Sequence, residues 1–587
     1  MSNVFPGAQN ALRLTATCAL LILFAGNLPA QVLFTNVPIA APGVDTGWAA
    51  WGDYDNDGRL DFALLGYDSL NPLTEIWRNT GSGFTQTTVP GLPGAYDGVL
   101  VWGDYDNDGR LDFLLTGHGR TSRIAQLWRN TGGGFAIVDV PGLPGVEFSA
   151  AAWADFDNDG RMDFLITGSS PSGAIAQLWR NTGAGFTNVP IPGLPGVILG
   201  SVAWADYDND GRLDFLITGY TAPTRICQLW RNTGTGFTNV PMAGLPGVQL
   251  GGAIWGDYDG DGRLDFLLTG TTNGTADGVI AQLWRNTGSG FVYVPIAGLP
   301  GVYYSAAAWA DYDNDGRLDF LLTGSTNGTA DGVVAQLWRN TGAGFSSVSV
   351  PGLPGVDGSS VAWGDYDNDG RLDFLMTGYT GGSFVSQLWR STEAVASNAP
   401  PAAPSGLASS VSGHVVSLFW NTAADDHTPT ASLSYNLRVG TSPSAGNVLS
   451  AQAASGGFRS LPALGNCQLR TNAQLTLPSG IYYWSVQAVD GAFAGSPFPS
   501  AQVFTVGSAV SAPRLVNEQR LGNGAFQFAF TNTPGASFTV FATTNLGLTF
   551  GNWPPIGTVP EIAPGQFQFT DTQGTNSRVR FYRVRWP

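Results

Sequence analysis

A nine-residue motif that occurs seven times constrains the fold of this chain more than any other feature. Each copy reads D-(Y/F)-D-(N/G)-D-G-R-(L/M)-D, from residues 53–61 in the first copy to 365–373 in the last. Aspartates at positions 1, 3, 5 and 9 of a tight loop bring four carboxylates together, and the glycine at position 6 takes a bend that a side chain would obstruct. An ordinary turn does not require four aspartates at this spacing. The motif therefore predicts seven sites for a hard cation.

The motif lies in a repeat of nearly constant length. A tryptophan precedes each copy, and successive tryptophans are 51 residues apart four times and then 54 apart twice: Trp51, Trp102, Trp153, Trp204, Trp255, Trp309 and Trp363. A second tryptophan follows in each unit, and it always stands 25 residues before the first tryptophan of the next unit. The difference in length therefore falls in one loop of the unit, and the other segments keep their lengths.

Each unit reads as four short strands. They are the residues before the first tryptophan, then L-D-F-L-L-T-G, then A-Q-L-W-R-N-T-G, then G-F-x-x-V-P with a G-L-P-G turn. The second strand is apolar on both faces, as expected for a sheet packed between two others. A four-stranded antiparallel unit of about fifty residues has the size of a propeller blade. The sequence therefore predicts an all-β chain with a seven-bladed β-propeller.

The two ends of the repeat region complement each other. Unit seven stops at residues 387–392 and lacks the G-F-x-x-V-P strand, while residues 32–39 read V-L-F-T-N-V-P-I. That segment nearly repeats the F-T-N-V-P-I of residues 186–191. We therefore expect residues 32–39 to supply the missing strand of blade seven, which would close the ring without a free edge.

The run W-G-D-Y-D-N-D-G-R-L-D-F-L-L-T-G resembles the FG-GAP/VCBS repeat family, whose best known members are the integrin alpha-subunit propellers. The resemblance covers roughly residues 31–392. It implies about one calcium ion per blade, bound by the side chains at positions 1, 3, 5 and 9 and by the main-chain carbonyl at position 7. In this chain those positions are Asp53, Asp55, Asp57, Arg59, Asp61; Asp104, Asp106, Asp108, Arg110, Asp112; Asp155, Asp157, Asp159, Arg161, Asp163; Asp206, Asp208, Asp210, Arg212, Asp214; Asp257, Asp259, Asp261, Arg263, Asp265; Asp311, Asp313, Asp315, Arg317, Asp319; and Asp365, Asp367, Asp369, Arg371, Asp373.

The chemistry of the residues points to the same ion. Oxygen ligands in a flexible loop favour calcium over magnesium, which keeps its waters, and over zinc, which prefers nitrogen and sulfur. An EF-hand would need a glutamate at position 12, where the first unit has Leu64. Four carboxylates leave few open positions on an ion, so we expect the ions to be structural.

The acidity of the chain also follows from the motif. The formal charge is −17, and 28 of the 44 acidic residues lie in the seven motifs. Seven divalent ions carry 14 positive charges and would bring the chain to −3. The acidic residues therefore serve mainly to bind metal ions, and a nucleic-acid partner is not expected.

The N-terminal residues 1–30 have the pattern of a secretion signal, with Arg13 before a short apolar core. No segment is expected to span a membrane, because that core is too short for a bilayer. After cleavage only Cys227 and Cys467 remain, so no disulfide framework is implied. We expect a secreted or surface-associated protein, monomeric in solution.

Three segments follow the propeller. Residues 393–405 form an Ala/Pro-rich linker. Residues 402–506 contain an inward Trp420 and an alternating Tyr-rich run at 481–490, and they resemble a fibronectin type III domain. Residues 512–587 alternate aromatic and polar positions and are predicted to form a small β-sandwich, similar to C-terminal modules of secreted bacterial repeat proteins.

A ligand-binding face is predicted from the connections between strands. In an up-and-down blade the cation loops and the N-T-G-x-G turns share one face, and the variable loops share the other with the G-L-P-G turns. Four residues at equivalent positions on that second face are Tyr67, His118, Tyr220 and Tyr379. Aromatic rings on loops suit stacking on a sugar or a protein surface, although they could equally well only cover the blade tops.

The inventory of side chains favours binding over catalysis. The chain has no lysine, and His118 is the only histidine of the ring. Nearly every aspartate of the ring is assigned to metal, so a general base is hard to assemble, and motifs for a nucleophile or a phosphate loop are missing. We expect a non-catalytic binding or adhesion scaffold with an extracellular protein or glycan ligand. The alternative is a polysaccharide lyase or a lectin-like glycan binder on the same propeller.

Overall fold

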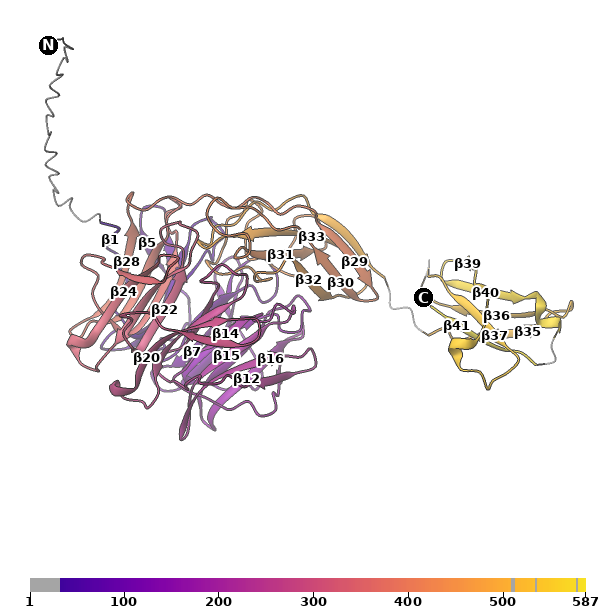
Figure 1. Cartoon of the computed structure of the whole chain (residues 1–587), viewed down its shortest axis with the longest axis horizontal. Helices are drawn as coiled ribbons and strands as arrows, with labels where there is room; N and C mark the ends of the chain where they lie inside the picture. The colour runs from indigo at the N-terminus through magenta and orange to yellow at the C-terminus, as the bar shows by residue number, and fades with distance from the viewer. Residues whose placement is uncertain (1–31, 508–511, 534–535, 577–578, 587) are drawn as a thin grey trace, which may run out of the picture.

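The structure is a computed structural model that describes residues 32–507, 512–533, 536–576 and 579–586 (Figure 1). The predicted secretion signal at 1–30 lies outside these residues. Nearly all regular structure in these ranges is β-strand, and the four helical segments found there are 3₁₀ helices of three to five residues. Among the described residues, no helix is long and apolar enough to cross a bilayer.

Seven four-stranded antiparallel sheets form the repeat region, and each follows the order of the sequence except where the ring closes. Blade 1 contains β2 (Asp45–Gly52), β3 (Asp61–Tyr67), β4 (Pro72–Asn79) and β5 (Phe84–Thr87). Blade 2 contains β6 (Leu100–Gly103), β7 (Asp112–His118), β8 (Arg123–Asn130) and β9 (Phe135–Val138). Blade 3 contains β10 (Glu147–Ala154), β11 (Asp163–Ser170), β12 (Gly173–Asn181) and β13 (Phe186–Val189). Blade 4 contains β14 (Val202–Ala205), β15 (Asp214–Thr221), β16 (Thr224–Asn232) and β17 (Phe237–Val240).

The last three blades include the two longer units. Blade 5 contains β18 (Ala253–Gly256), β19 (Asp265–Thr271), η1 (Ala276–Gly278), β20 (Val279–Asn286) and β21 (Phe291–Val294). Blade 6 contains β22 (Tyr303–Ala310), β23 (Asp319–Ser325), η2 (Ala330–Gly332), β24 (Val333–Asn340) and β25 (Phe345–Val348). Blade 7 contains β26 (Asp357–Gly364), β27 (Asp373–Tyr379) and β28 (Phe384–Ser391). The predicted four-stranded repeats are confirmed, and η1 and η2 lie in the longer variable loops.

The ring closes as predicted. β1 (Phe34–Val37) pairs antiparallel with β28, and Phe34 stands opposite Ser391. The Phe34 side chain is 1% exposed, and its ring lies 5.2 Å from that of Phe374 and 6.0 Å from that of Trp363. The first described residues therefore complete the last blade.

Blade packing explains the two tryptophans and the apolar second strand. The phenylalanine after each motif is fully buried, as Phe113 is in blade 2, and it contacts both tryptophans of its blade. The indole of the first tryptophan also donates a hydrogen bond to the preceding blade, as from Trp102 Nε1 to Ala50 O at 3.3 Å. These side chains hold neighbouring blades together and are not free to bind a ligand.

The connections divide the ring into two faces. The loop from the first to the second strand and the turn from the third to the fourth form the cation-loop face. In blade 1, the Arg59 guanidinium of the cation loop donates to Asn79 O beside that turn, at 3.1 Å. The loops from the second to the third strand and the connections between blades form the variable-loop face.

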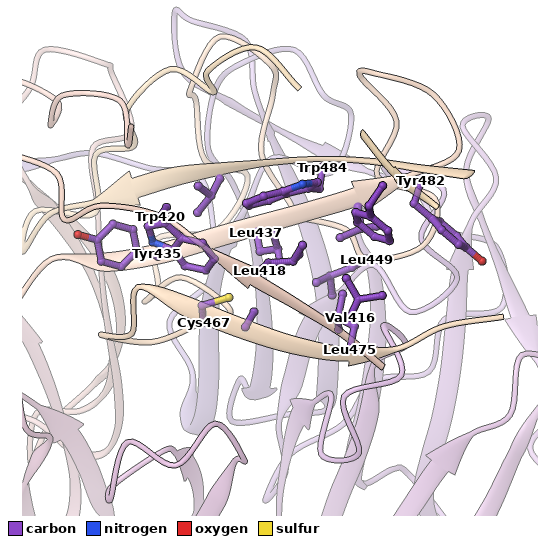
Figure 2. Close-up of a cluster of buried hydrophobic side chains, with 14 of the residues drawn as sticks. Val416, Leu418, Trp420, Tyr435, Leu437, Leu449, Cys467, Leu475, Tyr482 and Trp484 are labelled. Carbon is purple, nitrogen blue, oxygen red and sulfur yellow. The ribbon is translucent and has the colours of Figure 1, made fainter. Parts of the chain in front are cut away.

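A two-sheet sandwich follows the propeller. β29 (Ala408–Ser412), β30 (Val415–Phe419) and β32 (Asn472–Thr476) form one sheet, and β31 (Ser434–Gly440), β33 (Gly480–Val489) and β34 (Gln502–Val506) form the other. Trp420, Tyr435 and Trp484 fill its core (Figure 2). The predicted β-sandwich is confirmed, while its membership of the fibronectin type III family stays a prediction.

The sandwich packs against the cation-loop face of the propeller. The irregular segment 441–471 between β31 and β32 supplies many of the contacts, and Leu461 packs against the core of blade 2. Thr476 N donates to Asn158 O at 3.1 Å, and Asp311 N donates to Gly491 O at 3.0 Å. A mainly apolar cavity of about 560 Å³ lies between the centre of the ring and the sandwich. The sequence did not predict this docking.

The C-terminal module is a second sandwich. One sheet contains β35 (Val516–Arg520), β36 (Phe526–Thr531), β40 (Gln566–Asp571) and β39 (Glu561–Ala563); the other contains β38 (Pro555–Thr558), β37 (Thr539–Thr543) and β41 (Phe581–Arg585). Two 3₁₀ turns, η3 (Phe550–Asn552) and η4 (Thr572–Asn576), connect its strands. Phe528, Phe530, Phe538 and Phe567 form the core, so the predicted small β-sandwich is confirmed.

Candidate metal centres

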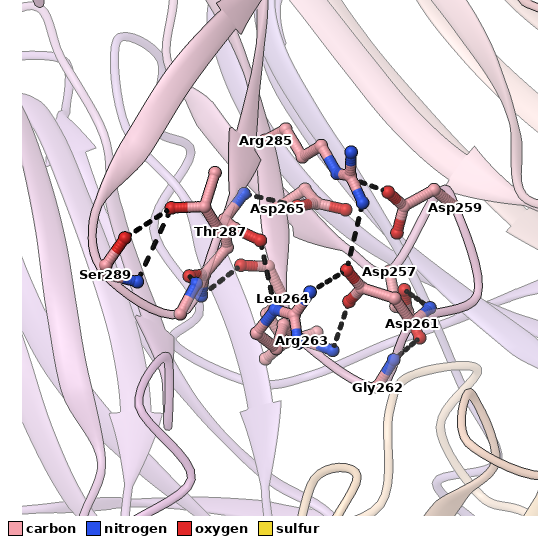
Figure 3. Close-up of polar contacts among 12 residues, drawn as sticks. Asp257, Asp259, Asp261, Gly262, Arg263, Leu264, Asp265, Arg285, Thr287 and Ser289 are labelled. Carbon is pink, nitrogen blue, oxygen red and sulfur yellow. Dashed lines mark hydrogen bonds and ion pairs between the residues drawn. The ribbon is translucent and has the colours of Figure 1, made fainter.

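The cation loop of blade 5 shows how the motif gathers carboxylates (Figure 3). Oxygen atoms of Asp257, Asp259 and Asp265 all lie within 4.8 Å of one another. The motif spans the end of β18 and the start of β19, so position 9 is the first residue of the buried second strand. Position 1 and position 9 are therefore fixed by the sheet, and the loop between them brings position 3 to the same point.

Backbone amides of the loop orient the position 1 carboxylate. Asp261 N donates to Asp257 Oδ1 at 3.1 Å, and Gly262 N donates to Asp257 Oδ2 at 3.0 Å. Gly262 has a φ of +81°, a conformation that favours glycine. The position 9 carboxylate, Asp265, accepts from Asn286 N at 2.6 Å. These bonds leave lone pairs of both carboxylates available for an ion.

The other blades repeat this convergence. Four more groups of three aspartates have oxygen atoms within 4.8 Å of one another: Asp53, Asp55 and Asp57; Asp104, Asp106 and Asp108; Asp155, Asp157 and Asp163; and Asp206, Asp208 and Asp210. In blades 6 and 7, Asp311 and Asp365 accept the same pair of backbone amides as Asp257 does. In blades 1 to 5 the structure thus brings three of the four predicted aspartates together: positions 1, 3 and 5 in blades 1, 2 and 4, and positions 1, 3 and 9 in blades 3 and 5. The complete four-carboxylate ligand set stays a prediction.

Neighbouring cation loops are also joined. Asn107 Nδ2 donates to Gly160 O at 2.8 Å, and Asn368 Nδ2 donates to Gly58 O at 2.8 Å, which links blade 7 back to blade 1. The asparagine at position 4 has a positive φ, +57° at both Asn107 and Asn368, and this conformation aims its side chain at the next loop. These links run from blade 7 through blade 1 to blade 5; blade 5 has Gly260 at this position, and Asn314 of blade 6 donates to Ala396 O instead.

Arginine side chains also enter each cation loop. In blade 5, Arg263 forms an ion pair with Asp261, and Arg285 Nε lies 2.6 Å from Asp259 Oδ2. The resemblance assigned only the carbonyl of Arg263 to the site, and nothing in the structure tests that ligand. Sequence reasoning missed Arg285, although the arginine of W-R-N recurs in the first six units and as W-R-S in the seventh.

The residues present fit a divalent cation. Four carboxylates and two guanidinium groups leave each loop with a net charge of about −2. Several buried carboxylate oxygens have no hydrogen-bond partner, among them Oδ1 of Asp55, Asp106 and Asp157 and Oδ2 of Asp319. Burial raises the pKa of Asp265 to about 8 and, with the Asp155 carboxylate nearby, that of Asp163 to about 9. A cation among these oxygens would remove the electrostatic cost of their ionised form.

The sandwich makes the loops unequal. Ser432 Oγ donates to Asp257 Oδ2 at 2.8 Å, and the Ser450 hydroxyl hydrogen-bonds the Asp104 carboxylate. Arg470 Nε lies 2.6 Å from Asp206 Oδ2. Sequence reasoning treated the seven motifs as identical, because these three partners lie outside the repeat.

The predicted ligand-binding residues lie on the variable-loop face in two kinds of setting. Tyr67 and His118 are brought together by Tyr96, whose ring lies 5.6 Å from Tyr67 and 5.2 Å from the His118 imidazole. Tyr220 instead packs under the Arg225 guanidinium at 5.0 Å, and Tyr379 packs on Phe384 of its own blade at 5.5 Å. Tyr67 and His118 thus form one cluster, while Tyr220 and Tyr379 pack within their own blades.

The β-bulges on the variable-loop face were not predicted. The innermost strands of blades 1, 3, 6 and 7 shift register near their start. Phe148 and Tyr304 sit in two of these bulges with φ of +49° and +48°, and they are 36% and 43% exposed. Burial raises the pKa of Tyr304, and the carboxylates of Asp357 and Asp97, from other blades, add to the rise. The bulged strands also bond to neighbouring blades, since Asp97 N donates to Thr46 O at 3.1 Å and Leu199 N donates to Phe148 O at 3.0 Å.

Comparisons with known proteins match this architecture. The family described as FG-GAP-like repeat matches residues 53–115, 104–166, 155–217, 257–322 and 323–376, and all seven motifs lie inside these ranges. No curated protein sequence matches the chain.

Similar solved structures include two lyases and the FN1-FN3 domains of chicken CNTN1. The Bacillus licheniformis rhamnogalacturonan lyase PL11 is 12% identical, with 61% of this chain and 75% of that chain covered at a TM-score of 0.35. The rhamnogalacturonan lyase YesW is 13% identical, with coverage of 61% and 76% at 0.35. The chicken CNTN1 FN1-FN3 domains are 12% identical, with coverage of 36% and 69% at 0.22. These scores are too low to carry an argument about activity. Residues 53–217 and 257–376 of this chain match the FG-GAP-like repeat family.

Proposed function

We propose that this chain is a secreted or surface-associated, non-catalytic binding scaffold, in which calcium ions hold the propeller and the variable-loop face binds an extracellular protein or glycan. One observation carries the proposal. The sandwich covers the cation-loop face and contacts the position 1 carboxylates of blades 2, 4 and 5 through Ser450, Arg470 and Ser432. Ions held under another domain serve the architecture, and the opposite face is left for a partner.

A structural role for calcium is supported by the ligand set. Four carboxylates per loop leave little room for a substrate on the ion. For sites with extracellular-module affinities of about 0.1 to 1 mM, millimolar calcium contributes on the order of 1 kcal/mol per site by mass action. Over seven sites this sum is comparable to the net stability of a domain.

The variable-loop face is supported as the ligand face by its aromatic residues. The cluster of Tyr67, Tyr96 and His118 lies on it, and Phe148 and Tyr304 are exposed on its bulged strands. The positive φ of these two residues belongs to the repeat, because the equivalent residues of the other blades share it, so the support comes from the exposed rings alone. Rings of this kind stack on sugar faces and on apolar protein surfaces.

The proposal is tested by a glycan array and a panel of extracellular matrix proteins, each probed with and without calcium. The expected result is binding in calcium that is lost in a variant with Tyr67, His118, Tyr220 and Tyr379 replaced by alanine. The matched control replaces Tyr293, which is 48% exposed on the outer strand of blade 5. Equal loss in the control would contradict the assignment of the face.

A polysaccharide lyase is the second candidate, and one cluster favours it. His118 Nε2 lies 3.6 Å from Glu147 Oε2, and Arg123 donates to Glu147 Oε1 at 2.9 and 2.6 Å. A histidine beside a carboxylate can remove a proton, and an arginine can neutralise an acidic sugar. New unsaturated ends, followed by ultraviolet absorbance on anionic polysaccharides, would identify this activity, and His118→Ala would abolish it. Absence of turnover on such substrates would leave the binding scaffold as the function.

A further inference from the structure

We propose that Arg470 of the sandwich acts as a resident counter-ion in the cation loop of blade 4, so that this loop binds calcium more weakly than the other six. The inference rests on the proposed role of calcium in the loops. It concerns a residue outside the repeat, and it makes one of seven nearly identical sites distinct.

The position of Arg470 carries the argument. Its Nε lies 2.6 Å from Asp206 Oδ2, with side chains that are 8% and 0% exposed. Its Nη1 donates to Asn472 O at 3.0 Å, which fixes the guanidinium at the start of β32. A Cβ on Gly211, the position 6 glycine of the loop, would lie 3.2 Å from Nη1, so the guanidinium sits directly over the bend. Burial of this pair excludes the solvent screening that weakens surface ion pairs.

The loop of blade 4 is otherwise built like its neighbours. Oxygen atoms of Asp206, Asp208 and Asp210 lie within 4.8 Å of one another. Arg212 and Arg231 pair with these carboxylates as the equivalent arginines do elsewhere. Carboxylates for an ion are therefore present, and the difference lies in charge.

That difference is one unit of positive charge. Four carboxylates and two arginines give each cation loop a net charge of about −2, which one divalent ion neutralises. Arg470 brings blade 4 to about −1, so a divalent ion would leave an excess positive charge at a buried position. The sandwich residues at the position 1 carboxylates of blades 2 and 5 are the hydroxyls of Ser450 and Ser432, which add no charge.

Repulsion between a divalent ion and a buried guanidinium a few ångströms away is large enough to change affinity by about tenfold or more. The coupling is reciprocal: an ion in blade 4 opposes the docking of Arg470, and docking opposes the ion. In the cation loop of blade 4, the Arg470 guanidinium of the sandwich thus supplies part of the positive charge that a metal ion supplies in the other loops.

Calcium counting on the full chain tests the inference. Protein is dialysed against graded free calcium, and bound calcium is measured by elemental analysis. We expect six ions in one affinity class and a seventh that requires about tenfold more calcium. Arg470→Gln should move the seventh ion into the main class, and Arg470→Lys, which keeps the charge, should leave it weak. Arg438→Gln is the matched control, because Arg438 lies over the Phe498 ring at 4.2 Å in the same domain and forms no ion pair with a loop aspartate in the described residues.

Seven equivalent ions in the unmodified chain would overturn the inference, and so would a Gln variant whose isotherm matches that of the Arg438 control. A Lys variant that behaves like the Gln variant would show that charge is not the cause. If Arg470→Gln does not fold, crystals of the unmodified chain grown at limiting calcium decide the matter through anomalous scattering, with lower occupancy expected in blade 4. Absence of calcium from every loop would instead contradict the proposed function.

Discussion

The two faces of the propeller arise from the same seven repeats, yet they differ in how far the repeats are alike. The cation-loop face uses almost the same nine residues in every blade, and the position 1 carboxylates of three blades contact side chains of the sandwich. The variable-loop face differs in loop length and in its aromatic residues from blade to blade. Uniform sequence therefore goes with the face that holds the molecule together, and varied sequence goes with the face proposed to bind a partner.

Removal of calcium should have the largest effect, because it should destabilise the propeller and leave the C-terminal module unchanged. With about 1 kcal/mol per site, chelation is expected to lower the free energy of unfolding of the propeller by about 7 kcal/mol. The docked sandwich should lose stability with it, because it contacts the loops directly. The module at 512–587 serves as the internal control. Calorimetry with and without chelator measures this, and an unmoved propeller transition in protein shown to be calcium-free would refute it.

Opening the ring should damage both faces together. Phe34→Ala removes a fully buried ring from the packing of blade 7 and is expected to cost about 3 to 5 kcal/mol. Denaturant unfolding gives the value, and Val32→Ala, at a side chain that is 45% exposed, is the matched control with little expected effect. Calcium content and ligand binding should fall in parallel. A loss confined to one face would mean that the faces do not depend on a common ring.

Two asparagines at the same motif position should distinguish a residue that contacts the sandwich from one that does not. Asn107 Nδ2 donates to Val448 O at 3.0 Å, and its Oδ1 accepts from Ser450 N at 2.9 Å, so it joins blade 2 to the sandwich. Asn107→Gly is expected to cost about 1 to 3 kcal/mol of unfolding free energy.

The matched variant for this test is Asn56→Gly, at the same motif position in blade 1. Asn56 has nearly the same φ, +58°, but donates only to the next loop, at Gly109 O. Gly260 already occupies this position in blade 5, so glycine suits the loop. Thermal unfolding of both variants should show the larger loss for Asn107. Equal losses would mean that docking adds little to the cation-loop face.

Changes on the variable-loop face should have the smallest effect on stability and a clear effect on binding. Replacement of Tyr67, His118, Tyr220 and Tyr379 by alanine is expected to leave calcium content unchanged and to lower the melting temperature by only a few degrees. Each stacking ring contributes about 0.5 to 1.5 kcal/mol, so ligand affinity should fall by about tenfold or more. Binding assays beside calorimetry measure both quantities. Retained binding would contradict this assignment, and Phe148 and Tyr304 would become the next candidates for the binding site.

Sequence periodicity predicted the repeated part of the molecule well. The regular spacing of the tryptophans predicted the number and the boundaries of the blades. The missing strand of unit seven predicted the pairing of β1 with β28. The motif located the aspartates, because a nine-residue loop between paired strands has little freedom. The arginines that pair with them could have been found in the same way, since Arg78 and its equivalents always follow the second tryptophan of the unit directly.

The docked sandwich was beyond sequence reasoning. Ser450 and Arg470 lie in the irregular segment 441–471, which has neither a period nor a motif, and their partners are more than two hundred residues earlier in the chain. Such contacts depend on the placement of two whole domains. The bulges in the innermost strands were missed because a one-residue register shift leaves no mark in a short strand of small residues.

The pairing of β1 with β28 also sets an order of events during synthesis. A ribosome releases the chain from its N-terminus, so Phe34 emerges long before Ser391, the residue it faces in blade 7. Until that moment β1 has no strand to join, and the growing propeller is an open arc with an unpaired edge. Blades 1 to 6 can each fold locally as they appear, whereas blade 7 must wait for a contact that spans the whole repeat region. The last hydrogen bonds of the ring are thus formed by the first strand that was made.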